Sequence, residues 1–170
     1  MTASTRELIF YPSWTAGREG YAARIHVVFQ QYLADQGLRL THQRKQIVDF
    51  LLHSEQHVTM QEVYLALKGK GIGIVTVFRA LKMLEECRLA ERVTTPGGRA
   101  KFEIKYERPH HDHLICIECG GIREVQWPDV ERIQEKTCKA MRFLPIWHRH
   151  EIFGRCEVCQ SKRSEKGFQQ

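Results

Sequence analysis

Apolar positions in the first half of the chain recur every three or four residues, which is the spacing of one helix face. The first such run covers residues 20–36, and Gly37 follows it where a helix C-cap commonly stands. Thr41 is placed to cap a second helix, and Thr59 with Glu62 forms the capping-box pattern at the start of a third. These patterns predict three amphipathic helices, whose core positions are Tyr21, Ile25, Val28, Phe29, Tyr32, Leu33, Ile47, Val48, Leu51, Val63, Tyr64 and Leu67.

A fourth helical run, residues 74–87, has two faces of different character. Its predicted core stripe is Ile74, Val77, Leu81 and Leu84. The opposite face places an aromatic ring among cations, which is unusual for a helix that meets only solvent. Two short helices, a glycine-containing turn and a helix with a basic outer face are typical of a helix-turn-helix, whose last helix enters the DNA major groove. The residues of that outer face are Val75, Phe78, Arg79, Lys82 and Glu86.

Period-two alternation replaces helical spacing from residue 90 onward. Residues 90–94 and 101–104 alternate on either side of Pro96-Gly97-Gly98, which predicts a β-hairpin. Its basic tip, Arg99 with Lys101, is suited to contact phosphates as the wing of a winged helix. We therefore predict a winged-helix DNA-binding domain at residues 20–106, with a helical domain that carries a solvated basic face as the alternative.

Four further segments complete the predicted organisation, and the fold class is α+β. Residues 1–19 show no period and are expected to form an irregular N-terminal arm. Residues 107–109 form a hinge, because the residue before a proline avoids the helical region. A small α/β domain follows at residues 110–160, then a tail at 161–170; the polar chain from residue 160 is expected to be frayed. The elements expected in the α/β domain are strands at 111–117, 121–126 and 146–153 and a helix from 128 or 129 to 141 whose face is Val130, Ile133, Thr137 and Met141.

Four of the six cysteines form two Cys-x-x-Cys pairs, Cys116 with Cys119 and Cys156 with Cys159. Two thiolate pairs make a tetrahedral zinc site with no open position, so this site is predicted to be structural. A domain of this size has a marginal core, and the metal would supply much of its folding free energy. The alternative is that the thiols are buried or incidental. Cys87 lies in a helical run, as does Cys138, and both are interpreted as small buried hydrophobic residues.

A histidine-rich stretch precedes the first cysteine pair. If residues 110–115 are extended, His110 and Asp112 share one face while His111 and His113 share the other, so one strand can supply two sites. Imidazole and carboxylate together suit exchangeable iron, manganese, zinc or nickel. Histidines also serve in cores and on basic surfaces, which is the alternative for each of them.

The net charge and the absence of long apolar runs limit the kinds of binding partner that we expect. The chain of 170 residues carries a formal net charge of +6, which favours a polyanionic partner. No run of eighteen apolar residues occurs, and the N-terminus lacks the pattern of a secretory signal. We expect a cytoplasmic protein with no membrane partner.

The order of these motifs resembles the ferric uptake regulator (Fur) family of metal-dependent repressors. The resemblance covers roughly residues 34–160 and rests on the run from His110 to Gly120, then Glu124, His148 and the second cysteine pair. It implies that the winged helix binds double-stranded DNA, that the α/β domain forms a homodimer, and that the operator is an inverted repeat. Metal at the hinge would then act as corepressor by setting the angle between the two DNA-binding domains.

The resemblance also implies three sets of site residues. The family motif Thr-Val-Tyr-Arg stands here as Thr76-Val77-Phe78-Arg79, so the ring at Phe78 is kept and its hydroxyl is lost. The implied DNA contacts are Thr76, Phe78, Arg79, Lys82, Arg39 and Arg44. The implied interdomain regulatory ligands are His57, Glu103, His113 and Glu124. The implied ligands of a second regulatory site are His110, Asp112, Glu131 and His148.

The regulatory metal stays open at this stage. Glu124 is typical of iron sensors, whereas peroxide sensors have aspartate there, and no cysteine stands near Glu103 as in many zinc sensors. Fe(II) is therefore expected beside structural Zn(II), with Mn(II)- or Zn(II)-responsive regulators and a peroxide sensor as alternatives. His150 replaces a usually apolar residue, and it is interpreted either as a strand-surface histidine or as an extra ligand.

Two other classes compete with a regulator. Two histidines and a carboxylate can serve a small non-haem metalloenzyme, but the chain shows no separate acid–base motif and no phosphate-binding glycine loop. A zinc-ribbon interaction module would hold one zinc and use the histidines only as surface. The basic outer face of residues 74–87 favours the regulator, and we predict that the chain is not an enzyme.

Overall fold

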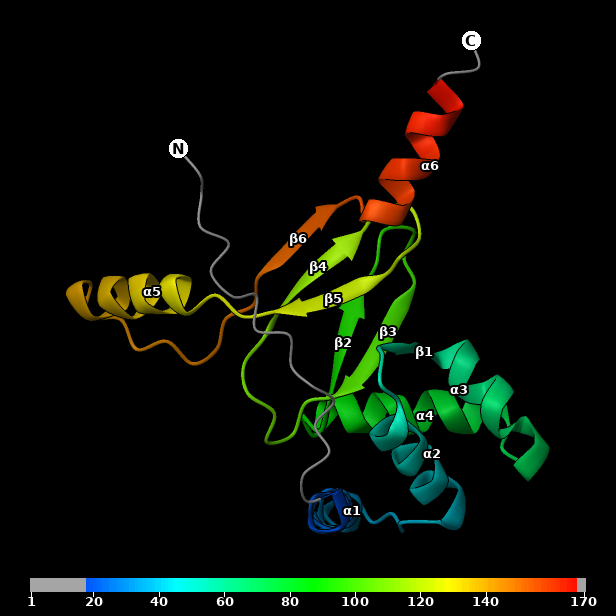
Figure 1. Cartoon of the computed structure of the whole chain (residues 1–170). Helices are drawn as coiled ribbons and strands as arrows, with labels where there is room; N and C mark the ends of the chain where they lie inside the picture. The colour runs from blue at the N-terminus through cyan, green and yellow to red at the C-terminus, as the bar shows by residue number, and fades with distance from the viewer. Residues whose placement is uncertain (1–17, 168–170) are drawn as a thin grey trace. The chain divides into compact units, whose positions relative to one another are not determined.

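The computed structural model describes residues 18–167, which form two compact units that meet in sequence at Arg108 and Pro109 (Figure 1). The predicted α+β class is confirmed, with a helical unit first and a small sheet unit second. Most of the expected N-terminal arm, residues 1–17, lies outside the described residues. Its last two positions already belong to the first helix, so the expectation of irregular chain is wrong there.

The first unit begins with the predicted helices, each ended or started by the residue that the pattern indicated. Gly37, at φ +68°, follows the first helix, and Thr41 accepts a hydrogen bond from the Arg44 N–H. The capping box is complete, since the Glu62 N–H donates to Thr59 Oγ1 at 3.1 Å and the Thr59 N–H donates to Glu62 Oε2 at 2.6 Å. The helices are α1 (Arg18–Asp35), α2 (His42–His53), α3 (Met60–Leu67), the 3-10 turn η1 (Lys68–Lys70) and α4 (Ile74–Glu86).

One hydrophobic core joins these four helices to the sheet of the same unit. Phe29 of α1, Val48 of α2 and Leu84 of α4 are all fully buried in it. The predicted stripe of α4 needs one correction, because Ile74 is 39% exposed while Ala80 is fully buried. Ile74 is the first residue of the helix and lies beyond the end of the core, and Ala80 lies one turn from Val77 and Leu84 on the same face.

The predicted hairpin is present and forms the wing. Strands β2 (Ala90–Thr94) and β3 (Ala100–Ile104) pair antiparallel, and the Thr95 N–H donates to the Arg99 carbonyl at 2.9 Å to close the loop. Gly97 and Gly98 both have positive φ there, which glycine adopts without strain. A short strand that the sequence did not predict, β1 (Val58–Thr59), pairs with β3, so the sheet order is β1-β3-β2.

The second unit is a three-stranded mixed sheet with two helices. Strand β4 (Asp112–Cys116) lies in the middle, antiparallel to β5 (Ile122–Val125) and parallel to β6 (Glu151–Gly154). Helix α5 (Pro128–Ala140) starts with proline at its first turn, as expected. The third strand is shorter than the predicted 146–153, because only its last part pairs along β4.

The chain is helical after the second cysteine pair as far as Gly167, the last described residue, which corrects the expectation of a frayed tail over that part. Helix α6 runs from Glu157 to Gly167. Glu157 lies in its first turn, where a negative charge is favoured by the helix dipole, and the Gln160 amide donates to the Arg155 carbonyl at 2.7 Å. These local bonds stabilise a polar helix that shows no apolar period.

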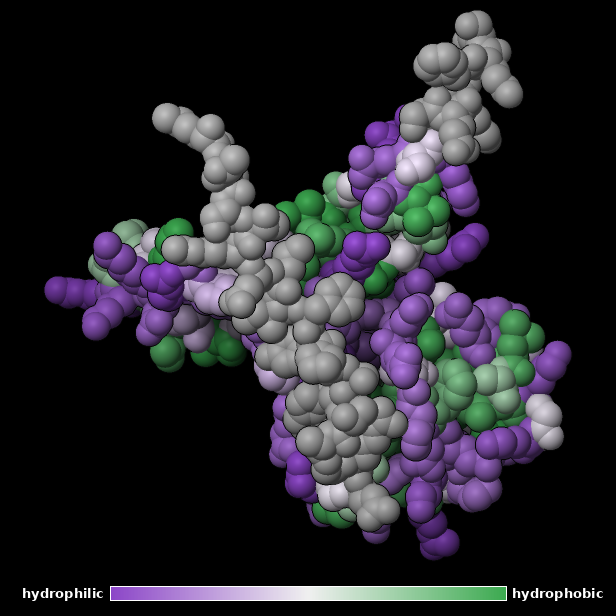
Figure 2. All heavy atoms as spheres, viewed as in Figure 1, coloured by the Kyte–Doolittle hydropathy of each residue, from purple (hydrophilic) through white to green (hydrophobic). Residues whose placement is uncertain are grey.

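Few apolar side chains of the described second unit are buried. They are Ile115, Cys116 and Cys159, and no residue of α5 is buried. Hydrophobic atoms instead reach the surface over α5 and the sheet (Figure 2), and Ile133 is 66% exposed. The predicted apolar face of α5 therefore lacks a partner within the described chain. No described helix is both long and apolar enough to cross a membrane.

Candidate functional site

The four paired cysteines come together at one end of the second unit. Because β4 and β6 are parallel, Cys116 at the end of β4 lies beside Gly154, two residues before Cys156. Each Cys-x-x-Cys segment closes a turn, with the Gly120 N–H donating to the Cys116 carbonyl and the Cys159 N–H donating to the Cys156 carbonyl, both at 3.0 Å. Topology thus brings two cysteine pairs that are far apart in sequence into one cluster.

The spacing of these sulfur atoms fits a zinc ion. The four Sγ atoms lie within 4.8 Å of one another, and Cys119 and Cys156 are 3.8 Å apart. Tetrahedral zinc with Zn–S bonds of about 2.3 Å requires sulfur–sulfur distances of about 3.8 Å. A side chain at Gly121 would place its Cβ 3.2 Å from Cys119 Sγ, so glycine leaves that sulfur room. The cluster fits a structural zinc ion, with no position left for a substrate.

The thiols of this cluster differ in acidity. The backbone N–H groups of Cys119 and Cys156 lower the pKa of Cys116 to about 6. A hydrogen bond with the Cys156 side chain raises the pKa of Cys159 to about 12. A bound zinc ion requires all four sulfurs as thiolates, so its binding releases the protons that the cluster keeps without metal.

The other half-buried and buried cysteines carry no such arrangement. Cys87 packs partly against the core of the first unit, and burial raises the pKa of its thiol. Cys138 on α5 is half-buried. The interpretation of both as buried residues is therefore too strong, although Cys87 does pack as a small apolar side chain against the core.

A second cluster lies at the opposite end of β4, around the first turn of α5. His110 Nε2 lies 3.6 Å from Glu131 Oε1, and His148 Nε2 lies 3.0 Å from the same oxygen. The three ligand atoms lie within 4.8 Å of one another. Around a metal with bonds of about 2.0–2.1 Å, tetrahedral ligand atoms stand about 3.3 Å apart, so the cluster needs little adjustment to hold an ion.

Asp112 completes this set and is its most buried member. Its Oδ1 lies 3.1 Å from His110 Nε2 and also accepts the His150 backbone N–H at 3.1 Å. Its Oδ2 is buried and has no hydrogen-bond partner in the described chain, and the residue is 0% exposed. A buried carboxylate oxygen without a donor is costly unless a cation is near. The structure therefore brings all four predicted residues of this set together.

His57 and Glu103 form a buried pair in the first unit. His57 precedes β1 and Glu103 lies on β3, and the pairing of these strands brings His57 Nε2 within 3.0 Å of Glu103 Oε1. Both residues are buried, and the other carboxylate oxygen of Glu103 makes an ion pair with Arg108. The short strand that sequence analysis missed is what positions this pair.

His113 and Glu124 form the matching pair in the second unit, since they are directly opposite in the β4–β5 ladder. His111 joins them, with its ring 5.2 Å from the His113 ring and its Nε2 3.9 Å from Glu124 Oε2. The side-chain alternation predicted for residues 110–113 is thus confirmed. His111 is the ligand candidate that the predicted set omitted, although the alternation itself placed it on the face of His113.

Helix α4 presents the predicted DNA-contacting face to solvent. Phe78 is 55% exposed and Val75 is 58% exposed, with Arg79 and Lys82 exposed beside them. Thr76 and Arg79 line a shallow hollow of about 190 Å³ together with Thr41, Gln43 and Arg44 of the α2 start. The guanidinium groups of Arg44 and Arg79 at this hollow suit a phosphate.

Arg39 and Arg44 are linked to each other, because the Arg44 guanidinium donates to the Arg39 carbonyl at 2.5 Å. Arg44 is therefore held at the edge of the hollow and Arg39 is exposed next to it. Of the six predicted DNA contacts, four lie on α4, Arg44 lies in the first turn of α2, and Arg39 lies on the segment before α2.

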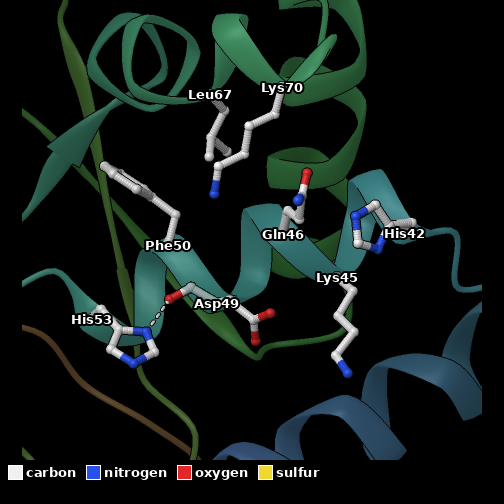
Figure 3. Close-up of a pocket in the computed structure, with 8 residues that line it drawn as sticks. All are labelled: His42, Lys45, Gln46, Asp49, Phe50, His53, Leu67 and Lys70. Atoms are coloured by element: carbon white, nitrogen blue, oxygen red, sulfur yellow. Dashed lines mark hydrogen bonds between the residues drawn. The ribbon is translucent and has the colours of Figure 1, made fainter.

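A larger hollow of about 430 Å³ between α2 and the α3–η1 segment carries no comparable chemistry (Figure 3). His53 Nδ1 lies 2.6 Å from the Asp49 carbonyl oxygen, and the Asp49 carboxylate lies 2.6 Å from His26. None of its eight lining residues is a serine, threonine or cysteine that could act as a nucleophile. The residues are His42, Lys45, Gln46, Asp49, Phe50, His53, Leu67 and Lys70.

Known proteins match both the sequence and the fold. The ferric uptake regulator family matches residues 35–153. A ferric uptake regulation protein of Campylobacter upsaliensis is 33% identical over 142 residues, which cover 81% of this chain and 90% of that protein.

Solved structures agree with this match. The Helicobacter pylori ferric uptake regulator Fur, described as having three functional metal binding sites, aligns with a TM-score of 0.74 at 29% identity and covers 82% of this chain and 93% of that one. A zinc-bound manganese uptake regulator aligns with a TM-score of 0.57 at 32% identity and covers 76% and 98% of the two chains.

Proposed function

This chain belongs to the ferric uptake regulator family of metal-responsive, DNA-binding transcriptional regulators, which are not enzymes, and we propose that it represses transcription as a homodimer when divalent metal is bound. The operator we propose is an inverted repeat, because a two-fold dimer presents two recognition helices to two half-sites. Binding to chromosomal DNA places its action in the cytoplasm.

The observation that carries this proposal is the division of metal ligands into two chemical kinds. Four thiols form a closed set, which suits a permanent ion, whereas the histidines and carboxylates suit an ion that exchanges with the cell. A metal-responsive regulator uses both kinds of site. A permanent ion stabilises the fold, and an exchangeable ion binds only when its concentration in the cell is high enough.

We assign the interdomain regulatory site to His57 with Glu103 in the first unit and His113 with Glu124 in the second, and we add His111. Each pair combines imidazole with carboxylate, and His57, Glu103 and His113 are buried while the Glu124 side chain is 27% exposed. Metal bound by ligands from both units favours one arrangement of the DNA-binding unit over the others, and the DNA affinity rises by the differential binding energy. Fe(II) is the proposed corepressor, and Mn(II) and Zn(II) fit the same donors.

The homodimer is supported by the exposed apolar surface of the second unit. Among the described residues of this small unit, ten large apolar side chains are exposed, which is unusual for a monomer and is typical of a chain that uses such a surface as an interface. We propose that a second copy of the chain covers it. The exposed residues are Ile117, Ile133, Met141, Phe143, Leu144, Ile146, Trp147, Ile152, Phe153 and Val158.

A substitution at His113 tests the proposed function. His113→Ala is expected to abolish metal-dependent DNA binding while the protein stays folded and dimeric, because His113 would supply a regulatory ligand. His113 is 1% exposed, so Glu124→Gln, a near-isosteric change at a less buried ligand, serves as the second variant. His53→Ala, at an exposed histidine of α2, is the matched control.

Metal-dependent DNA affinity that survives in both folded variants would refute the assignment of the regulatory site. Loss of the response in the His53→Ala control would show that the assay reports general damage, and the variants would then have to be compared by direct metal titration.

A further inference from the structure

A third histidine, His150, lies beside the second metal-ligand cluster. Its carbonyl accepts the His113 N–H at 3.1 Å, so the chain is extended there and His148 and His150 project from the same face. The centroids of their rings are 5.4 Å apart, and the rings of His148 and His110 are 4.2 Å apart. Three imidazole rings therefore follow one another along this end of the sheet.

Helix α5 supplies one hydrogen-bond partner to the ring of His148 and one to the ring of His150. Glu131 and Gln134 are three residues apart and share one helix face. His148 Nε2 lies 3.0 Å from Glu131 Oε1, and His150 Nε2 lies 2.9 Å from the Gln134 amide nitrogen. The Gln134 amide N–H donates to His150 Nε2, so the lone pair of that nitrogen is occupied by a weak, neutral hydrogen-bond donor. A metal ion can replace such a donor.

The backbone of His150 is also tied to the cluster, because its N–H donates to Asp112 Oδ1 at 3.1 Å. The other oxygen of Asp112 is buried and has no partner in the part of the chain that the structure describes. His150 thus contacts Asp112 of the cluster through its backbone, while its ring lies next to the ring of His148. The buried Asp112 Oδ2 beside it has no hydrogen-bond donor among the described residues.

We propose that His150 is an additional imidazole donor of this second site, held by Gln134 until a metal ion enters, and that it shifts the site toward nitrogen-preferring ions. The inference rests on the second metal site described above. Three imidazoles with one or two carboxylates favour Zn(II), Co(II) and Ni(II), whereas Mn(II) prefers oxygen donors and gains little from a further imidazole. The second site then differs in selectivity from the interdomain site.

Metal titration of His150→Leu tests this assignment. The full-length chain is used with its thiolate-bound zinc in place and with His113→Ala as background, which removes one interdomain ligand and so reduces the competition from that site. Zn(II), Co(II) and Mn(II) affinities are measured against a chromophoric chelator, and the ligand-field absorption of bound Co(II) is recorded. We expect Zn(II) and Co(II) affinities to fall by about tenfold or more, the Co(II) spectrum to change, and the Mn(II) affinity to stay within about twofold.

Two control variants show whether the effect is specific to the His150 imidazole. His53→Leu changes an exposed histidine of the other unit and is expected to alter neither affinity nor spectrum. Gln134→Leu removes the neutral donor but no ligand, so the Co(II) spectrum is expected to stay that of the unmodified site.

Each other outcome overturns the inference. Unchanged Zn(II) and Co(II) affinities and spectrum would show that His150 is only a surface histidine. An equal loss for all three ions would indicate a structural role without selectivity. If no ion binds beyond the thiolate-bound zinc in the His113→Ala background, the second site itself is wrong, while metal-dependent DNA binding of the unmodified chain still tests the proposed function separately.

Discussion

Phe78 and Leu81 lie one turn apart on α4, on either side of the boundary between its exposed and its buried surface, and truncating each to alanine separates DNA recognition from folding. Phe78 is 55% exposed and Leu81 is 1% exposed. Phe78→Ala is therefore expected to weaken DNA binding with little effect on the free energy of unfolding. Leu81→Ala is expected to lower that free energy by roughly 2–5 kcal/mol, because it leaves a cavity in the core of the first unit.

The size of the DNA effect follows from the exposed area of the ring. A phenylalanine side chain buries roughly 200 Å², so an exposed fraction of 55% leaves about 110 Å² for DNA to cover. At ~25 cal/mol per Å², full coverage contributes about 2.7 kcal/mol and half coverage about 1.4 kcal/mol. Half coverage corresponds to about a tenfold loss of affinity for each protomer, or about a hundredfold for a dimer on two half-sites.

Fluorescence anisotropy with a labelled inverted-repeat operator measures the affinity, and urea unfolding measures the stability of each variant. Phe78→Tyr is the matched control, because it keeps the ring and restores the hydroxyl that the family motif carries, so its affinity is expected to equal or exceed that of the unmodified chain. The reasoning is refuted if Phe78→Ala binds within twofold of the unmodified protein, or if it loses as much unfolding free energy as Leu81→Ala.

Four further predictions concern the capping box, the zinc site and the dimer. Thr59→Ala is expected to cost about 1 kcal/mol of unfolding free energy, measured with urea, by removing the capping box; no loss would contradict that role. The hydrogen bond from the Thr59 N–H lowers the pKa of Glu62, so the stability that the Glu62 charge adds over Glu62→Gln is expected near neutral pH and disappears as pH falls through the lowered pKa. Cys119→Ser is expected to make the chain after Pro109 protease-sensitive while the winged-helix unit resists, and equal resistance of both units would argue against a structural zinc. Ile133→Glu is expected to give folded monomers in sedimentation, because its side chain is already 66% exposed, and an intact dimer would exclude α5 from the interface.

Local signals in the sequence were sufficient for most of the first unit. The Thr41 cap, the Thr59–Glu62 capping box and the glycines of the wing act within a few residues, and the structure forms each of them. The helical period also separated the exposed Phe78 from the buried Leu81 on α4. Such features depend only on neighbouring residues and not on contacts with distant parts of the chain, so they can be predicted directly from the sequence.

The features that were missed depend on distant partners or show no period. A strand of two residues such as β1 cannot display alternation, and it exists because β3 offers it a pairing edge. Helix α6 is mostly polar and shows no apolar period, and only its local hydrogen bonds and first-turn acid indicate it. The face of α5 was predicted as apolar, but a single chain cannot show what covers that face.

The ligand clusters could be predicted in part from the sequence. Alternation along β4 assigned His110 and Asp112 to one face and His111 and His113 to the other, and the contacts within the second unit follow that division. His150 next to Gln134 could not be found by spacing, because it depends on how α5 packs near the start of β6. Side-chain direction was thus predictable, whereas the meeting of separate elements was not.

The most direct test of metal-dependent repression is the affinity for an inverted-repeat operator as a function of free Fe(II), Mn(II) and Zn(II), with the thiolate-bound zinc left in place. We predict that at least one of these ions raises the affinity by about tenfold or more, which corresponds to about 1.4 kcal/mol of coupling. The same ion is expected to lose this effect in His113→Ala. Tight operator binding that is indifferent to all three ions would contradict the corepressor account.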